Sequence, residues 1–203
     1  MVPLFALLTS LSITLAKQGT RSTGIRKLAT FDDLKPFPAL PEVNPVGRYM
    51  GLNFKSFDLF RRGVGGTSPT GIIPQSDDQL AVAGLITGTT MGYPALIPVS
   101  PYKTFNLRSL YFACAINTLQ SLATVPEQCV VAFTAYLPGS TVAYQTINQH
   151  FSPTNPILSK MQRATFPTSW AKMGKVEVAV IQSASTSTLA SLFLDDVDYS
   201  LYK

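Results

Sequence analysis

The sequence predicts an all-β protein, an antiparallel β-sandwich with jelly-roll connections. Short runs rich in β-branched and aromatic residues recur along the chain, and Gly- and Pro-containing turn signals separate them. Helical periodicity is almost absent, which favours two packed layers of strands over a helical or mixed fold. A jelly roll of roughly eight strands fits this pattern.

Residues 1–27 are predicted to precede a single folded domain that spans 28–203. Residues 1–16 carry no charge and end in small residues, as a secretory signal peptide does; the alternative is a buried N-terminal strand or helix. Residues 17–27 carry four basic residues and predict a flexible lead segment. No other segment is suited to anchor the chain in a membrane.

The composition favours an extracellular protein. Charged residues make up only 13% of the chain, about half of the usual quarter. The formal net charge of +5 comes mostly from the lead segment, because the chain from Phe31 onward holds 12 basic and 11 acidic residues. Such sparse positive charge predicts no nucleic-acid partner. Weak contact between the lead segment and an acidic wall polymer or a membrane is the alternative to a plain soluble tail.

The expected elements follow from alternation and from turn residues. Strands are expected at 28–34, 49–60, 95–100, 107–116, 128–137, 141–151, 158–167, 176–180 and 189–202. Residues 36–47 and 61–75 are Pro- or Gly-rich and predict loops, whereas 77–86 is ambiguous between strand and helix. Leu52 and Phe54 are expected to face the core.

The chain is organised around a predicted hairpin of 107–116 and 128–137. A polar connection that ends in proline separates these two apolar runs. Cys114 and Cys129 fall on their more apolar faces, so neighbouring strands would allow a disulfide, which contributes about 3 kcal/mol. Secretion favours the disulfide; the alternative is two free buried thiols.

The last strand contains a local conflict, because alternation places Asp195 in an otherwise apolar row. A buried carboxylate needs a partner, a hydrogen-bond network or a metal ion. First and last strands of sandwiches are often neighbours, so Asp32, Asp33, Asp195 and Asp196 are candidate ligands of a structural Ca²⁺. In the alternative, a bulge turns one aspartate outward and the others accept hydrogen bonds from backbone or Ser/Thr groups.

Candidate ligand contacts are aromatic. Trp170, the only tryptophan, and Tyr49 and Tyr102 could stack on a sugar ring if they are exposed. The alternative places them in or at the rim of the core.

No catalytic residue is predicted. His150 is the only histidine, so any triad would have to use it, and a structural or surface role is the expected one. The glycine-rich stretch 63–71 lacks the Lys-Ser/Thr ending of a phosphate-binding loop, and no Gly-x-Ser-x-Gly elbow occurs.

Four short motifs carry a resemblance to known families. The stretches TFDDL, YMGLNF, FNLRSLYFAC and SLFLDDVDY together resemble a family of secreted fungal proteins of unassigned function. The ending FLDDVDY also resembles the last strand of calcium-containing jelly-roll carbohydrate-binding modules of the galactose-binding-like type. That resemblance implies a structural ion near the chain termini, held by Asp195 or Asp196 with Asp32 or Asp33.

These observations together predict a secreted, non-catalytic binding protein that recognises a cell-wall or surface glycan. Two alternatives remain open. One is an extracellular polysaccharide hydrolase or lyase whose catalytic carboxylates the sequence does not identify. The other is a secreted protein-interaction or effector protein without glycan affinity.

Overall fold

The protein is an all-β antiparallel sandwich, as predicted. The structure, a computed structural model, describes residues 23–35, 44–62, 71–84, 93–117, 124–184 and 190–203. These residues form no helix. Their strands are β1 (Ile25–Ala29), β2 (Pro45–Tyr49), β3 (Leu52–Arg61), β4 (Ile72–Ile73), β5 (Gln79–Ala83), β6 (Ala95–Pro98), β7 (Thr104–Asn117), β8 (Thr124–Pro126), β9 (Cys129–Tyr136), β10 (Ala143–Phe151), β11 (Ser159–Lys160), β12 (Gln162–Thr165), β13 (Lys175–Ser183) and β14 (Ala190–Tyr202).

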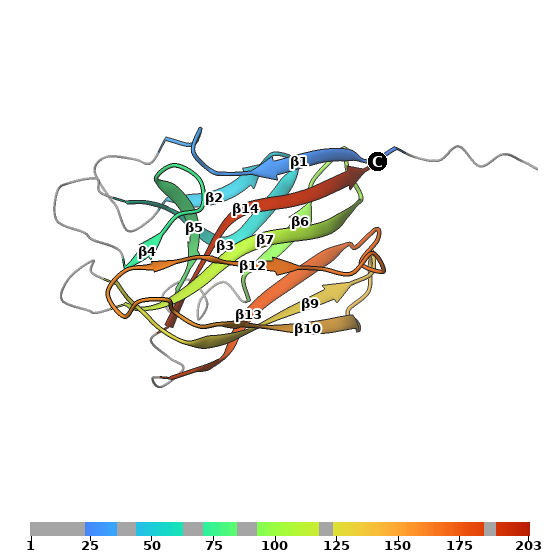
Figure 1. Cartoon of the computed structure of the whole chain (residues 1–203). Coiled ribbons are helices and arrows are strands. Elements are labelled where there is room, and N and C mark those ends of the chain that lie inside the picture. The colour runs from blue at the N-terminus through green and yellow to red at the C-terminus, as the bar shows by residue number, and fades with distance from the viewer. Residues whose placement is uncertain (1–22, 36–43, 63–70, 85–92, 118–123, 185–189) are drawn as a thin grey trace, which may run out of the picture.

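One large sheet curls to form both layers of the sandwich. Its strand order is β10-β9-β13-β6-β3-β5-β14-β7-β12, and β1, β2 and β8 pair with β14, β3 and β7. In Figure 1 the β13–β9–β10 end lies beneath the β14–β7–β12 end. A short parallel pair of β4 and β11 stands apart. Since the sheet is curled, each strand has one face toward the core and one toward the outside.

Aromatic side chains fill the space between the two layers. Leu52 and Phe54, expected to face inward, are both buried. Phe112 of β7 contacts Phe133 of β9 and Phe151 of β10 edge-to-face, with ring centroids 6.2 Å apart in each pair. Burial of each such ring contributes about 2 kcal/mol, so these cross-layer contacts hold the two ends of the sheet together.

The disulfide is present, but the hairpin expected around it is not. Cys114 in β7 and Cys129 in β9 form the disulfide with their Cα atoms 6.2 Å apart. Strand β7 pairs with β14, β12 and β8, whereas β9 pairs with β10 and β13. The chain does reverse after β7, because β8 pairs with it, but β9 then crosses to the other layer. Alternation identified the buried faces correctly and could not identify the hydrogen-bonded partners.

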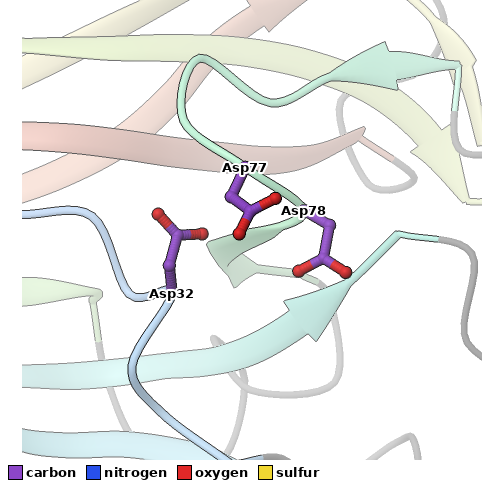
Figure 2. A group of neighbouring side chains, drawn as sticks. All are labelled: Asp32, Asp77 and Asp78. Carbon is purple, nitrogen blue, oxygen red and sulfur yellow. The ribbon is translucent and has the colours of Figure 1, made fainter.

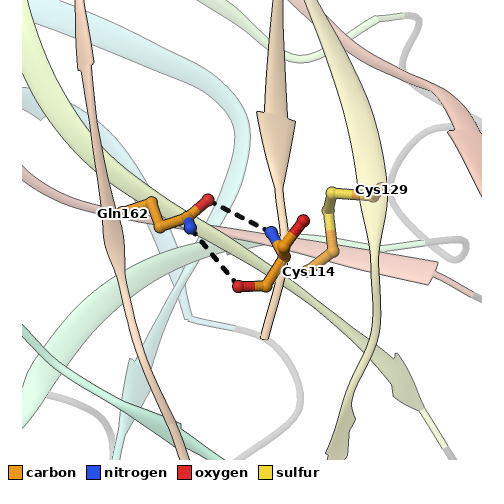
Figure 3. The surroundings of a disulfide bond; sticks show 4 residues. Cys114, Cys129 and Gln162 are labelled. Atoms are coloured by element: carbon orange, nitrogen blue, oxygen red, sulfur yellow. Dashed lines mark hydrogen bonds between the residues drawn. A yellow bond between two sulfur atoms is a disulfide. The ribbon is translucent and has the colours of Figure 1, made fainter. Parts of the chain in front are cut away.

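Figure 3 shows the surroundings of this disulfide, with Gln162 of β12 nearby. The Gln162 amide makes two hydrogen bonds to the backbone of Ser152. Ser152 N–H donates to its Oε1 at 3.1 Å, and its Nε2 donates to the Ser152 carbonyl at 3.3 Å. The segment that follows β10 is thereby attached to β12 of the opposite layer.

The first and last strands lie side by side, as expected. Strand β1 pairs with β14 from Ile25↔Leu201 to Ala29↔Val197. It begins three residues before the predicted start of the domain, so Arg26 and Lys27 belong to the sheet rather than to a flexible segment. The predicted signal peptide, 1–16, lies outside the described residues.

Candidate functional site

The buried carboxylate expected in the last strand is present, and backbone groups surround it. Asp195 is fully buried in β14. Its Oδ2 accepts hydrogen bonds from the N–H groups of Gln75 (2.8 Å) and Ser76 (2.9 Å). Its Oδ1 accepts from the Ser76 hydroxyl (3.1 Å) and the Asp196 N–H (2.7 Å). Burial raises the pKa of Asp195 to about 7, although these hydrogen bonds act to lower it.

A β-bulge follows Asp195, which is the alternative that the sequence left open. The pairing of β14 with β7 shifts between Asp195 and Asp198, and Asp196 adopts a left-handed backbone with φ of 46°. Asp195 remains in the core, while Asp196 is half-buried beside the loop that precedes β5.

Of the four predicted metal ligands, Asp33 and Asp195 are held by hydrogen bonds to other groups, whereas Asp32 and Asp196 remain near each other. Asp33 is exposed, and its carboxylate accepts a hydrogen bond from the Tyr49 hydroxyl. Asp195 has the partners just described. Asp32 and Asp196 lie close enough for the charge of Asp32 to raise the pKa of Asp196, after the larger effect of burial.

Two further aspartates join Asp32. Asp77 and Asp78, in the loop between β4 and β5, place carboxylate oxygens so that one from each of the three residues lies within 4.8 Å of the others. Figure 2 shows the three carboxyl groups together, with Asp32 on the loop that follows β1. The sequence pointed to neither Asp77 nor Asp78 as a metal ligand. The only available signal was a pair of adjacent acids in a turn-rich segment.

The aromatic candidates for sugar contact pack against the protein itself. Trp170 is 1% exposed, stacks on Phe166 with ring centroids 4.9 Å apart, and donates through Nε1 to Gln145 at 2.7 Å. Tyr49 is buried. Tyr102 is half-buried, and its ring lies against Gly51. The structure therefore supports the core interpretation for Trp170 and Tyr49, and buried rings cannot stack on a ligand.

Tyr136, Lys175 and Glu177 form a polar cluster on the outer face of the β9 and β13 layer. Both oxygens of Glu177 accept hydrogen bonds, from the Tyr136 hydroxyl and from Lys175 Nζ, each at 2.7 Å. Lys175 Nζ also lies 4.0 Å from the centroid of the Tyr136 ring. Partial burial raises the pKa of Glu177, but these hydrogen bonds and the charges of Lys175 and Lys55 outweigh it, so the pKa is lowered overall. Both carboxylate oxygens of Glu177 therefore have hydrogen-bond donors, and Lys175 covers one face of the Tyr136 ring.

The outer face of the opposite layer carries three arginines, one from each of β1, β7 and β12. Register places Ser200 of β14 opposite Arg26 of β1, and Asp198 opposite Ser109 of β7. Arg108 is the extra residue where the pairing of β14 with β7 shifts, next to Ser109. These three strands and β14 form one continuous outer surface.

All three guanidinium groups converge on side chains of this surface. Arg26 makes a bidentate pair with Asp198, at 3.0 Å from Nε and 2.8 Å from Nη2. Arg108 Nη2 donates to the Ser200 hydroxyl at 2.7 Å, and Arg163 Nη2 donates to the Ser109 hydroxyl at 3.2 Å. We call this surface the arginine face, comprising Arg26, Arg108, Ser109, Arg163, Asp198 and Ser200.

The arginine face has an excess of positive charge. Asp198, Ser109 and Ser200 are buried beneath the three exposed arginines. Only Arg26 has a carboxylate partner among the described residues, because the other two guanidinium groups contact neutral hydroxyls. The sequence did not single out this surface, since partners such as Arg26 and Asp198 lie 172 residues apart in the chain.

His150 lies exposed on β10, at one end of the sheet order. No helix of the described residues is long and apolar enough to cross a membrane. The Cys114–Cys129 disulfide is typical of extracellular proteins.

Comparison with known proteins identifies a likeness in fold. No protein-family model matches the chain, and no curated protein matches it. Among solved structures, the chain resembles a DUF4465 family protein from Bacteroides caccae, with a TM-score of 0.53 and 12% sequence identity. The alignment covers 95% of this chain and 99% of that protein. At this identity the likeness concerns the fold alone. Neither the resemblance to fungal secreted proteins nor that to calcium-containing modules gains support from these comparisons.

Proposed function

We propose that this protein is a secreted, non-catalytic binding protein that recognises an acidic cell-wall or surface glycan through the arginine face. The observation that carries the proposal is the convergence of three exposed guanidinium groups on a buried base that holds a single carboxylate.

The guanidinium groups suit carboxylate ligands. Each presents N–H donors in a planar fork that matches the two oxygens of a carboxylate. Arg108 and Arg163 are held by one hydrogen bond each to a serine hydroxyl, so their positive charges stay available at the surface. Because these contacts already order the side chains, less conformational entropy is lost when a ligand binds.

The surface suits a polysaccharide better than a nucleic acid. A nucleic-acid site neutralises a dense row of phosphates and needs a larger excess of basic residues. The arginine face offers only three guanidinium groups, one of which is already paired with Asp198, and these are too few for a dense row of phosphates. The acid groups of a polyuronate, spaced along a polymer that has hydroxyls between them, fit a few guanidinium groups held from below by Ser109 and Ser200.

The opposite layer supports glycan binding less well. The Tyr136 ring is covered by Lys175 on one face, and both oxygens of Glu177 already have donors. A sugar would have to displace these contacts, which would offset the gain from stacking.

Calorimetry with a polyuronate oligomer tests the proposal, with a neutral oligomer of matched length as the comparison. The wild-type protein is expected to bind the acidic oligomer and to lose affinity as salt is added. The Arg108→Ala/Arg163→Ala variant is expected to bind about tenfold more weakly or worse. The matched control is Lys55→Ala/Lys160→Ala, which removes the same charge at exposed positions outside the arginine face.

Three results would overturn the proposal. They are equal affinity for the acidic and neutral oligomers, equal loss in both double variants, and release of new reducing ends from the polymer. The affinities for a sulfated polysaccharide and for single-stranded DNA, measured in the same way, show which class of anion the arginine face prefers. Tighter binding to DNA than to polyuronate would replace the glycan with a nucleic acid.

A further inference from the structure

The three clustered aspartates are arranged as a set of oxygen ligands. Asp32 follows β1, whereas Asp77 and Asp78 precede β5, so two distant segments bring their carboxylates within 4.8 Å of one another. Carboxylates repel one another at this separation unless a cation or a proton lies between them. Among the described residues, only Arg61 makes a salt bridge to the cluster, through its Nε to Asp78 Oδ2 at 2.8 Å.

Gln79 provides an independent indication of a ligand. Its side chain is only 4% exposed and lies against Asp32, donating from Nε2 to the Asp32 carbonyl at 2.7 Å. Its backbone N–H points to Asp32 Oδ1 at 3.4 Å. The remaining amide oxygen, Oε1, is buried, and no donor of the described residues reaches it. Buried amide oxygens of this kind are nearly always satisfied, by a protein donor, a water or a cation.

Asp196 provides a second oxygen of the same kind. Its Oδ1 is buried, and no hydrogen-bond donor within the described part of the chain reaches it. The left-handed backbone at Asp196 turns this residue out of the regular alternation of β14. A buried carboxylate oxygen without a donor, close to Asp32, adds a fourth negative group to the same region.

The loop that carries Asp77 and Asp78 is held in place beside Asp196. The two residues just before it, Gln75 and Ser76, donate their backbone N–H groups to Asp195. These bonds order the loop through contacts that do not use the oxygens of the cluster, so a binding geometry exists before a ligand arrives.

We propose that Asp32, Asp77 and Asp78 bind a calcium ion, with Gln79 Oε1 and Asp196 completing a shell of oxygen ligands. Calcium takes six to eight oxygens from carboxylates, amides and water, in an adaptable geometry. Magnesium demands a tighter octahedron, and zinc favours the nitrogen and sulfur ligands that this cluster lacks. The ion would link the loop after β1, the loop before β5, and β14. This site is separate from the arginine face and does not depend on the proposed glycan binding.

Calorimetric titration of chelator-treated full-length protein with CaCl₂ tests the site, with no glycan present. The expected result is one calcium ion per chain, a higher melting temperature with calcium, and much weaker binding of Mg²⁺. Asp77 is exposed, so Asp77→Asn is expected to fold. This variant should bind calcium about tenfold more weakly or worse, because it removes a charged ligand.

Asp58→Asn is the matched control, because Asp58 is a half-buried aspartate of β3 outside the cluster. It is expected to keep wild-type calcium affinity. Without calcium, Asp77→Asn should melt at or above the wild-type temperature because a repulsive charge is gone, which separates loss of the site from failure to fold. No heat and no change in melting temperature with wild-type protein at millimolar calcium would overturn the proposal, as would equal affinity in the two variants.

Discussion

Asp195 in the last strand accepts the backbone N–H of Ser76 at 2.9 Å, and thereby fastens the loop before β5 to the centre of the sheet. The two residues are far apart in sequence, and the carboxylate is fully buried. Its position in an apolar row is compatible with folding because four donors surround it.

Replacing Asp195 by alanine is expected to destabilise the protein by about 3 kcal/mol or more. The change removes the fully buried acceptor of the backbone N–H groups of Gln75, Ser76 and Asp196, and it leaves a cavity in the core. Ser76→Ala, which removes only a hydroxyl donor, should cost about 1 kcal/mol. Urea denaturation of the three proteins measures the difference, and equal midpoints for the two variants would contradict this account.

Removing the disulfide is expected to cost about 3 kcal/mol. Cys114 and Cys129 close a loop with a sequence separation of 15, which limits the freedom of the unfolded chain. A Cys114→Ala/Cys129→Ala variant should therefore unfold at lower urea concentration than the oxidised wild type. Reductant should lower the wild-type midpoint and leave that of the variant unchanged. A wild-type midpoint that does not respond to full reduction would argue against the stabilising role.

The cluster around Glu177 predicts a dependence on pH. The pKa of Glu177 is lowered, so the stabilisation that its carboxylate provides is complete above its ordinary value near 4.5 and is lost as the pH falls through the lowered value. Glu177→Gln should therefore melt below the wild type at pH 7, by an amount equivalent to less than about 1 kcal/mol. The gap between the two melting temperatures should close toward pH 3. A gap that widens on acidification would reverse the assigned sign.

Trp170 predicts a spectroscopic signature. Because its indole is buried and hydrogen-bonded to Gln145, native fluorescence should be blue-shifted and poorly quenched by acrylamide. Unfolding in urea should shift the emission to the red. Addition of polyuronate should leave both the emission maximum and the quenching unchanged, since the indole does not face solvent. Strong quenching of the native protein would place the ring at the surface.

The sequence predicted which side chains enter the core more reliably than it predicted which strands pair. Alternation located the burial of Phe54 and Asp195, since inside and outside positions follow a period of two along any strand. The same rule does not say which strands are hydrogen-bonded to each other. The disulfide between Cys114 and Cys129 was predicted correctly, yet the two cysteines belong to strands in opposite layers rather than to one hairpin.

The candidate sites depended on the tertiary structure to a greater degree. Asp32 was identified from its place near the start of the domain, but Asp77 and Asp78 joined it only because the β4–β5 loop lies against Asp195. The arginine face is assembled from β1, β7, β12 and β14. The pairing of β1 with β14 was expected, but no local pattern encodes the adjacency of β7 to β14 or of β12 to β7.

The amino-acid order by itself indicated an all-β chain and the inward faces of its main strands, because these follow from local alternation, and it favoured a disulfide between the two cysteines because the composition is that of an extracellular protein. Only the curling of the sheet decided which charges meet. The interaction energy of two charges depends on their distance in space. The number of residues between them in the sequence does not give that distance, which is set only when the two layers pack together.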